Sequence, residues 1–429
     1  MSEVATNQTI LVAGGGISGM TAALEAAECG KEVVLVEKRA ALGGRVSQLY
    51  KYFPKMCRPH CGQEINQRRI RANRRLRVLT LAEITKLRGA PGDYTATIKI
   101  APRHVNSNCT ACGDCASAVS AEIDSPHDYG MRKVKAAYLP HNLAWPQRYV
   151  IDASIAGGEQ GAAARDACRY GAVDLDMREE TIELKCGAVI FATGWRPYDA
   201  AKIQPYGYAR YDNVVTSVEF ERMLDPYGPT GGKLLRPSDG AEAKDVAFVQ
   251  CAGSRDRNHL AHCSRVCCMA SLKQSMYVGE CYGEDARATI YYIDIRGIDR
   301  FEDFERQVRA DERVRFVKSK VARIEQNADG SPVLHGVDTH GARRYANTHD
   351  LAVLAVGMQP SVDANEVFEE GATSVDASGF IQARDGENGN DGVFAAGCAA
   401  DALDVNRSVQ SATAAALRAI QVVNRAARA

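Results

Sequence analysis

The chain has 429 residues, of which 45% are hydrophobic and 25% are charged. This composition is typical of a folded globular protein and excludes a disordered or low-complexity chain. The 53 basic and 53 acidic residues cancel, so no global charge favours nucleic acid or an anionic membrane surface.

The amino terminus has no basic leader followed by an apolar segment, and no apolar run is long enough to span a membrane. We therefore expect a soluble cytoplasmic protein. A reducing cytosol keeps thiols free, so the 14 cysteines are expected to be metal or redox ligands more often than disulfides.

Residues 9–37, TILVAGGGISGMTAALEAAECGKEVVLVE, predict a strand, a glycine turn, an Ala-rich helix and a second strand. Gly14, Gly16 and Gly19 form G-x-G-x-x-G, which permits a tight turn, close approach of a pyrophosphate and helix–strand packing. Phosphates would bind at the helix N-terminus, and Glu37 would accept the ribose hydroxyls of an adenosine. The pattern predicts a dinucleotide site, with a plain tight turn as the alternative.

Later segments indicate FAD. Gly43, Gly44 and Arg45 resemble the E-x₅-G-G-R signature of two-dinucleotide-domain flavoproteins, in which the glycine pair lets the chain pass close to the cofactor. That family also places an A-T-G segment after a late strand of its FAD domain, and it ends with a strand, a glycine turn and a long helix near the flavin. The corresponding residues here are Ala192, Thr193, Gly194 and residues 392–423, with Gly397 in the turn.

Residues 245–251, DVAFVQC, predict the first strand of a second nucleotide-binding unit, but no glycine fingerprint follows it. We therefore expect no NAD(P)H binding. Four cysteines follow instead, and they suit a [4Fe-4S] cluster beside a helix start. A zinc site that includes His259 or His262, and ordinary core thiols, remain open. The four cysteines are Cys251, Cys263, Cys267 and Cys268.

The pattern C-x-G-S-R-D followed by C-S-x-x-C-C is similar to the A subunit of heterodisulfide reductase and its relatives. The resemblance implies a thioredoxin-reductase-like flavoprotein in which these four cysteines hold a [4Fe-4S] cluster.

Residues 52–66 and 135–152 most resemble the A subunit of the quinone-interacting membrane-bound oxidoreductase complex. That family implies a soluble FAD protein relaying electrons between adenylylsulfate reductase and a quinone-linked membrane subunit. The implied partners are a membrane haem subunit together with a second flavo-iron–sulfur subunit. Attachment to the inner membrane would occur through them.

An insert of about 80 residues separates the strand ending at Ile100 from a strand predicted over residues 183–195. Two-cluster ferredoxins have two C-x₂-C-x₂-C-x₃-C runs, and the fourth cysteine of each run ligates the other run's cluster. The insert keeps one full set of ligands, Cys109, Cys112, Cys115 and Cys168. The positions of the other set are occupied by Val119, Gly158, Gly161 and Ala164. We therefore predict one [4Fe-4S] cluster in the insert; an idle remnant, a zinc site or a three-iron cluster are the alternatives.

Cys57 and Cys61 are candidate redox thiols, because disulfide reductases place a cysteine pair near this point of the chain. Their C-x₃-C spacing departs from that group's C-x₄-C, which favours ordinary thiols and leaves an interface or partner-cluster role open. Residues 66–77 contain six arginines and predict either a solvated helix face or a docking surface for an acidic partner.

The sequence as a whole predicts an α/β flavoprotein of the glutathione or thioredoxin reductase type with a ferredoxin-like insert. The expected domains are a split FAD domain (1–105, 181–240 and 351–429), the insert (106–180) and a relic NAD(P)-like domain carrying a cluster (241–350). The expected function is electron relay through FAD and two clusters within a sulfur-metabolising complex. The alternatives are a heterodisulfide-reductase-like complex of sulfur oxidation, an NAD(P)H-dependent disulfide oxidoreductase and a structural scaffold.

Overall fold

A computed structural model describes residues 6–298, 300–361, 367, 374–382 and 392–427. Parts of the expected FAD-domain ranges (1–5, 362–366, 368–373, 383–391 and 428–429) and residue 299 of the expected relic domain lie outside these residues. The chain divides into two compact units. The first comprises Met1–Ser47, His60–Trp195 and Pro360–Ala429, and the second comprises Gln48–Pro59 and Arg196–Gln359. No helix of the described residues has both the length and the apolar character needed to cross a membrane.

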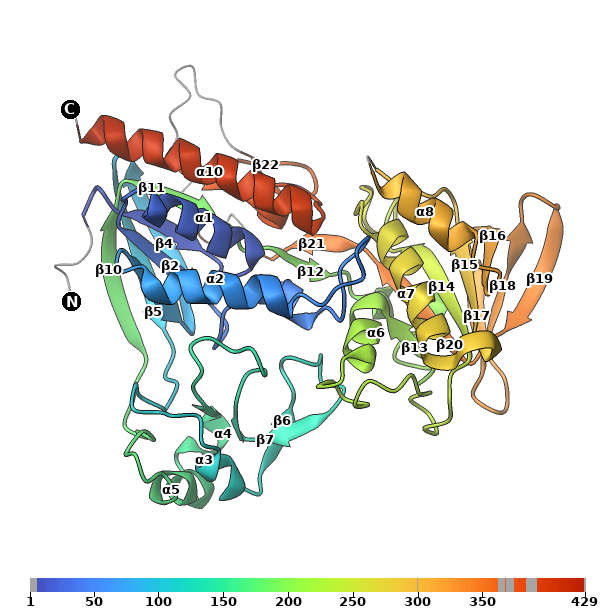
Figure 1. The fold of residues 1–429 in the computed structure, drawn as a ribbon, viewed down its shortest axis with the longest axis horizontal. Helices are drawn as coiled ribbons and strands as arrows, with labels where there is room; N and C mark the ends of the chain where they lie inside the picture. Colours follow the sequence, from blue (N-terminus) through green and yellow to red (C-terminus); the bar gives the residue numbers. More distant parts are fainter. Residues whose placement is uncertain (1–5, 299, 362–366, 368–373, 383–391, 428–429) are drawn as a thin grey trace. The chain divides into compact units, whose positions relative to one another are not determined.

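A five-stranded parallel sheet forms the centre of the first unit (Figure 1). Its strands are continuous apolar runs, because helices cover one face and a second sheet covers the other. Their order is β24 (Val393–Ala395), β11 (Ala188–Phe191), β1 (Ile10–Ala13), β2 (Val33–Glu37) and β3 (Leu76–Thr80). The covering helices are α1 (Ile17–Glu28), α2 (His60–Ala72) and α10 (Val405–Ala426). Alanines let α1 and α10 pack closely side by side, and together they bury one core of the unit.

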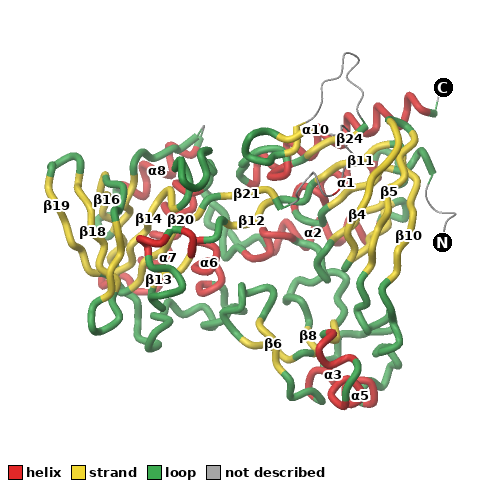
Figure 2. The backbone as a smooth tube through the Cα atoms, turned by 180° about the vertical axis from the view of Figure 1, so that it is seen from behind, coloured by secondary structure: helices red, strands yellow, loops and turns green. Residues whose placement is uncertain are grey.

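An antiparallel sheet covers the opposite face, where Figure 2 shows it most clearly. Its strands, in spatial order, are β10 (Glu180–Cys186), β5 (Asp93–Ile100) and β4 (Ala82–Ala90). The single strand predicted over residues 183–195 is therefore wrong: the chain leaves this sheet after Cys186 and enters the parallel sheet at Ala188. Gly187 makes the change possible, because a methyl group there would lie 2.0 Å from the carbonyl oxygen of Asn7.

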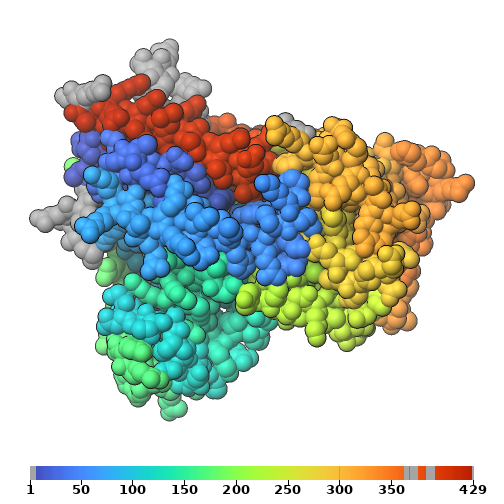
Figure 3. Space-filling model, in the orientation of Figure 1, coloured from blue at the N-terminus to red at the C-terminus, as the bar shows by residue number. Residues whose placement is uncertain are grey.

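The insert has its own small hydrophobic core and forms a lobe of the first unit (Figure 3). Its helices and strands are short. They are α3 (Asp114–Ser117), β6 (Glu122–Asp124), β7 (Lys133–Lys135), β8 (Ala137–Tyr138), β9 (Val150–Ile151), α4 (Ala153–Ala156) and α5 (Glu159–Asp166). Strands β6 and β7 pair antiparallel, as do β8 and β9.

The second unit repeats the strand–helix–strand plan with another five-stranded parallel sheet. Its order is β13 (Val214–Thr216), β20 (Leu351–Val356), β14 (Asp245–Ala252), β15 (Arg287–Tyr292) and β16 (Val314–Lys318). Its helices are α6 (Ser217–Leu224), α7 (Cys267–Tyr282) and α8 (Phe301–Arg309). An antiparallel sheet adds β17 (Arg323–Gln326), β18 (Pro332–Asp338) and β19 (Arg343–Thr348).

Shorter pieces complete the described chain. Two-stranded pairs are formed by β12 (Trp195–Pro197) with β21 (Met358–Pro360), and by β22 (Ser374–Val375) with β23 (Ile381–Gln382). Single 3₁₀ turns are η1 (Gly44–Gln48), η2 (Ala200–Lys202), η3 (Gln204–Tyr206), η4 (Gly283–Asp285) and η5 (Gly397–Ala399).

A buried ion pair fastens α6 to α7 in the second unit. The Lys273 amine lies 2.8 Å from the Glu221 carboxylate, and both side chains are at most 3% exposed. Glu221 also accepts from the backbone N–H of Tyr50 at 2.9 Å, and Lys273 donates to the carbonyl of Lys51 at 2.8 Å. The segment Gln48–Pro59 is thereby held against both helices.

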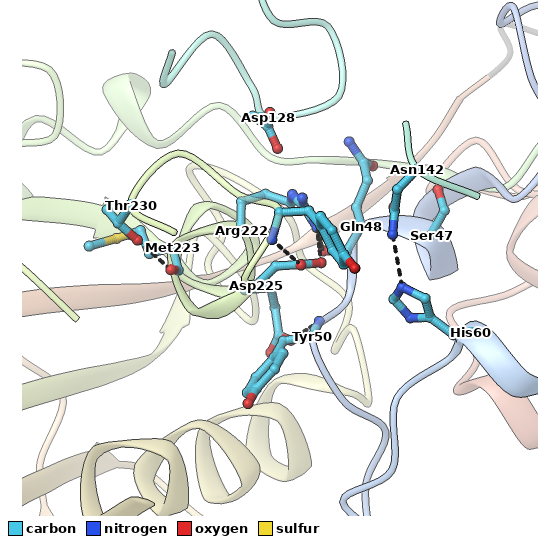
Figure 4. A network of polar contacts seen from close by, with 12 residues as sticks. Ser47, Gln48, Tyr50, His60, Asp128, Asn142, Arg222, Met223, Asp225 and Thr230 are labelled. Carbon is cyan, nitrogen blue, oxygen red and sulfur yellow. Dashed lines mark hydrogen bonds and ion pairs between the residues drawn. The ribbon is translucent and has the colours of Figure 1, made fainter. Parts of the chain in front are cut away.

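A second buried ion pair lies at the end of α6. Arg222 contacts Asp225 at 2.8 Å, with side chains 2% and 6% exposed, and donates to the carbonyl of Gln48 at 3.4 Å (Figure 4). The segment Gln48–Pro59 is therefore held by buried charged side chains. A buried charge needs an opposite charge or a hydrogen-bond partner, because it has lost its contact with water.

Lys273→Met should destabilise the second unit by about 3–5 kcal/mol, because it leaves the Glu221 carboxylate buried and uncompensated. Calorimetric unfolding of the purified protein measures this. The control is Lys244→Met, whose ion pairs with Glu242 and Asp285 involve a side chain that is 41% exposed; it should change stability by less than about 1 kcal/mol. Equal melting of both variants would contradict a stabilising role for the buried Lys273–Glu221 ion pair.

Candidate functional site

The turn between β1 and α1 brings backbone segments unusually close together. A methyl group at Gly19 would lie 1.6 Å from the carbonyl oxygen of Gly14, and one at Gly44 would lie 2.7 Å from Cα of Gly16. Gly14 also has φ +105°, which side chains rarely adopt. The absence of side chains at these positions leaves the N-terminus of α1 open to an anion.

Glu37 stands at the end of β2, where the sequence predicts it. Its carboxylate is 7% exposed and accepts from the backbone N–H of Gly15 at 2.5 Å and of Arg39 at 2.7 Å. Burial raises the pKa of Glu37, and the two N–H donors partly oppose that shift. The carboxylate is thus fixed beside the glycine turn.

The predicted cofactor residues converge on one cavity of about 270 Å³ in the first unit. Its wall includes Gly14, Gly16, Glu37, Gly44, Arg45 and the segment 192–194. Gly19, Gly43 and Gly397 lie outside that lining. Gly43 and Gly397 have φ +121° and +60°, and a methyl group at Gly397 would lie 2.0 Å from Oγ of Ser18. These glycines therefore allow the surrounding backbone to close around the cavity.

Cations in the cavity wall complement an anionic ligand. Lys38, Arg39 and Arg45 all line it. Burial, and then the charge of Arg45, lower the pKa of the Arg39 guanidinium, which indicates two partly desolvated positive charges close together. A glycine cradle, a carboxylate and paired cations fit the pyrophosphate and ribose of FAD.

Arg45 is held on both sides. It donates from Nε to the carbonyl of Trp195 at 3.1 Å and from Nη1 to the hydroxyl of Tyr129 at 2.7 Å. Its guanidinium carbon lies 5.3 Å from the ring centroid of Trp195 and 5.5 Å from that of Tyr129. No local pattern in the sequence singles out Tyr129, because its partner Arg45 lies 84 positions away in the chain.

In the second unit, four cysteines gather between the end of β14 and the start of α7. We call Cys251, Cys263, Cys267 and Cys268 the α7 cysteine site. Cys251, Cys267 and Cys268 are buried, and Cys263 is partly exposed. In the first unit, α1 follows β1 after a short glycine turn. In the second unit, the first residue of the corresponding helix, α7, is Cys267. The positive end of the helix dipole therefore faces thiols, where it favours their anionic form.

The loop that carries the α7 cysteine site is strained. Cys251, Arg255 and Arg265 have φ values of +57°, +55° and +60°, which L side chains rarely adopt. Such strain persists only where the surroundings impose it, and it is common at functional sites.

The thiols of the α7 cysteine site influence one another. Burial first, and then the neighbouring sulfurs of Cys268, Cys251 and Cys263, raise the pKa of Cys267 well above its usual range. Burial likewise raises the pKa of Cys268 to about 12. Four thiolates could therefore form together only if bound cations compensated their charge. Burial raises the pKa of Cys251, and the positive charge of Arg255 opposes that shift. Arg255 also forms an ion pair with Asp294.

The insert cysteine site, defined as Cys109, Cys112, Cys115 and Cys168, is also brought together. Cys109, Cys115 and Cys168 pack on the core of the insert. Burial first, and then the sulfurs of Cys109, Cys168 and Cys112, raise the pKa of Cys115 to about 11. An ion pair of 2.8 Å between Arg169 and Asp114 ties the residues next to Cys168 and Cys115 to each other.

Cys168 differs from its neighbours in its hydrogen bonds. Burial by itself would raise its pKa, but backbone N–H groups of residues 172, 173 and 170 outweigh burial and lower it. The N–H of Ala172 lies 3.3 Å from the sulfur. The backbone after Cys168 therefore stabilises a thiolate there.

The four positions that lack a cysteine have structural roles instead. Val119 and Ala164 are 2% and 0% exposed in the core of the insert. Gly158 is the N-cap residue of α5, and Gly161 is buried within that helix, where a methyl group would lie 2.5 Å from the carbonyl of Ile155. Val119 and Ala164 therefore contribute apolar packing to the core of the insert.

Across the described ranges, no three His, Cys, Asp or Glu side chains converge closely enough to bind a single metal ion. A lone zinc ion needs its ligands at about 2.3 Å, whereas each cysteine of a [4Fe-4S] cluster binds a different iron, so the sulfurs are more widely spaced. His259 and His262 have other partners, the hydroxyl of Tyr198 at 2.8 Å and the carbonyl of Met358 at 2.9 Å.

The structure does not assign a role to the two candidate redox thiols or to the arginines of residues 66–77. Cys57 and Cys61 are exposed free thiols, Cys57 in the second unit and Cys61 on α2 in the first. On α2, Arg68 and Arg69 pair with Glu64 and Glu28. His60 of the same helix contacts Asn142 of the insert at 3.2 Å (Figure 4). The redox pair and the docking surface stay predictions.

Comparison with known proteins identifies relatives. A family model described as FAD dependent oxidoreductase matches residues 9–234. The chain is 34% identical to the A subunit of the ferredoxin/F420H2-dependent CoB-CoM heterodisulfide reductase of Methanosarcina acetivorans, over 97% of this chain and 53% of that protein. It is 35% identical to an iron-sulfur A subunit of the CoB-CoM heterodisulfide reductase of Methanopyrus kandleri, over 97% of this chain and 64% of that protein. The resemblance to the heterodisulfide reductase protein is thereby confirmed, although the chain spans only 53–64% of these curated relatives.

Solved structures show the fold. Thioredoxin reductase of T. acidophilum and bacillithiol disulfide reductase of Bacillus cereus each superpose with a TM-score of 0.52 at 12% identity. Each match covers 98% of this chain, with 100% and 99% of the respective neighbour. The expected α/β fold of two dinucleotide-binding-type domains is confirmed.

Gly19→Ala should weaken FAD binding at least about tenfold, because the new methyl group would displace the Gly14 carbonyl and with it the phosphate turn. Flavin absorbance of the purified protein, before and after FAD is added, measures this. Gly157→Ala is the matched control, since no atom lies within 4 Å of the added methyl group. Full flavin content in both variants would contradict the proposed cradle.

Proposed function

Because this chain belongs to the family of FAD-dependent oxidoreductases, we propose that it is an electron-transfer subunit of a multi-subunit redox complex. The proposed cofactors are one FAD and two [4Fe-4S] clusters. The observation that carries the proposal is the convergence of two four-cysteine sets, one in each unit, in a chain that also builds a dinucleotide cavity.

When bound, FAD would exchange electrons singly or in pairs, and each cluster would exchange them one at a time. The part of the protein is to hold and tune these groups. Gly14, Gly16 and Gly44 would admit the pyrophosphate, Glu37 would accept ribose hydroxyls, and Arg45 would supply fixed positive charge. Electron relay needs no general base, and we assign none.

The α7 cysteine site supports a cluster through its chemistry. Its thiols are buried and raise one another's pKa, so iron cations would be needed to stabilise the thiolates together. The start of α7 would lower the energy of the anionic cluster through the helix dipole. The same arrangement leaves no glycine turn for a diphosphate after β14, so we propose that NAD(P)H is not a donor.

The insert cysteine site supports a second cluster, because the cysteines that the insert keeps form one complete set of ferredoxin ligands. All four cysteines needed for one ferredoxin cluster are present, and burial together with the sulfurs of the other three raises the pKa of Cys115. Two of the positions needed for the other cluster are filled by the core residues Val119 and Ala164. An idle remnant would not require Cys168 to lie near Cys115. The Arg169–Asp114 ion pair holds that approach.

The relatives suggest the setting. They are named as subunits of heterodisulfide reductases, so we propose that this chain assembles with other subunits of a heterodisulfide-reductase-like complex. A quinone-interacting complex that serves adenylylsulfate reductase, with peripheral membrane attachment, is the finer proposal and is supported by the sequence resemblance alone. Identification of co-purifying subunits distinguishes the two.

Iron and labile-sulfide analysis of anaerobically purified protein should give about eight iron atoms per FAD, four for each cluster. Cys168→Ser and Cys267→Ser should each lose about four, because each removes a ligand of a different cluster. Cys29→Ser is the control, since Cys29 is exposed at the end of α1. About four iron atoms in the parent protein, unchanged in Cys168→Ser, would contradict the second cluster.

Arg255→Gln should lower the midpoint potential of the α7 cluster by on the order of 60 mV, the tenfold step of a one-electron couple. The reason is that loss of the positive charge near Cys251 removes stabilisation of the more negative, reduced state. Redox titration followed by electron paramagnetic resonance measures this shift. Arg257→Gln removes an exposed charge from the same loop and is the matched control; an equal shift would mean that the position of Arg255 beside Cys251 has no part.

A further inference from the structure

One side chain of the insert reaches the wall of the dinucleotide cavity. The hydroxyl of Tyr129 accepts from Nη1 of Arg45 at 2.7 Å, and its ring lies against the guanidinium. Trp195 contacts the same guanidinium through its ring and its carbonyl. Arg45 lines the cavity, so the orientation of one of its cations is set by a residue that belongs to neither nucleotide-binding strand–helix unit.

The backbone of Tyr129 is strained into this position. Its φ is +54°, a conformation that bulky side chains rarely adopt. The preceding residue of the loop between β6 and β7, Asp128, is 0% exposed. That carboxylate accepts from Oγ of Ser125 at 2.9 Å and from Nε of Arg132 at 2.6 Å. Backbone strain of this kind is common at functional sites. The positive φ of Tyr129 therefore indicates a functional role for its side chain.

That role follows from the charges in the cavity. Arg39 and Arg45 both line the cavity. Burial, and then the charge of Arg45, lower the pKa of the Arg39 guanidinium, so the two like charges disfavour each other. A hydroxyl acceptor and two aromatic rings help to hold the Arg45 guanidinium in one orientation. A positive group fixed before binding loses little conformational entropy when an anionic ligand arrives.

We propose that Tyr129 is a positioning residue for the dinucleotide. Tyr129 fixes the orientation of Arg45, and so a residue of the cysteine-bearing insert contributes to the wall of the FAD cavity. The inference rests on the proposed FAD binding. It adds a specific coupling between the insert and the cofactor site.

The test is a double-mutant cycle on FAD affinity, measured by flavin fluorescence on the full-length apoprotein reconstituted with FAD. Tyr129→Phe keeps the ring and removes the acceptor, and should weaken FAD binding about three- to tenfold. Tyr129→Leu removes both and should weaken it further. In an Arg45→Lys background, where the planar fork is lost, Tyr129→Phe should add little, because Tyr129 acts through Arg45.

Tyr227→Phe is the control, since this tyrosine is 56% exposed. Unchanged iron content in the Tyr129 variants shows that the insert still folds. Wild-type affinity in both Tyr129 variants, or fully additive effects in the cycle, would overturn the inference. Failure of the parent protein to bind FAD would instead overturn the proposed function, so the two failures are distinguishable.

Discussion

The close approach of backbone at the first glycine turn is the constraint on which the dinucleotide site depends. Gly19 packs against the carbonyl of Gly14, and Gly44 against Gly16, at distances that leave no room for a methyl group. These contacts bring α1 down on the sheet, expose its N-terminal N–H groups and place Glu37 beside them. The cavity, its carboxylate and its cations all follow from a chain that has no side chains at these positions.

The second unit uses the same strand–helix geometry for different chemistry. Its sheet and α7 repeat the plan of β1 and α1, but a long strained loop replaces the glycine turn and delivers cysteines to the helix start. A helix N-terminus stabilises negative charge whether that charge belongs to a phosphate or to a thiolate. The same strand–helix geometry therefore favours negative charge at the start of α1 and at the start of α7.

The insert combines a small hydrophobic core with the insert cysteine site. Val119 and Ala164 stand where a two-cluster ferredoxin has cysteines, and both belong to this core. The same core also packs Cys109, Cys115 and Cys168. Tyr129, in the β6–β7 hairpin loop, then connects this lobe to Arg45 in the cofactor cavity.

Much of this was determined by the sequence itself, because the signals are local. Gly14, Gly16, Gly19 and Glu37 lie within one strand–helix–strand segment, and the spacing of Cys109, Cys112 and Cys115 is readable within a few residues. The sequence pattern did not reveal that the chain changes sheets at Gly187, since apolar residues continue on both sides of it.

Only the tertiary structure decided which distant residues meet. Cys168 reaches Cys115 through an ion pair between their neighbours, and Arg45 meets Tyr129 across 84 positions of sequence. The buried pair of Glu221 and Lys273 likewise joins two helices whose separate patterns give no hint of a partner. Local spacing specifies turns and helices, whereas long-range contacts depend on how the packed layers bring side chains together.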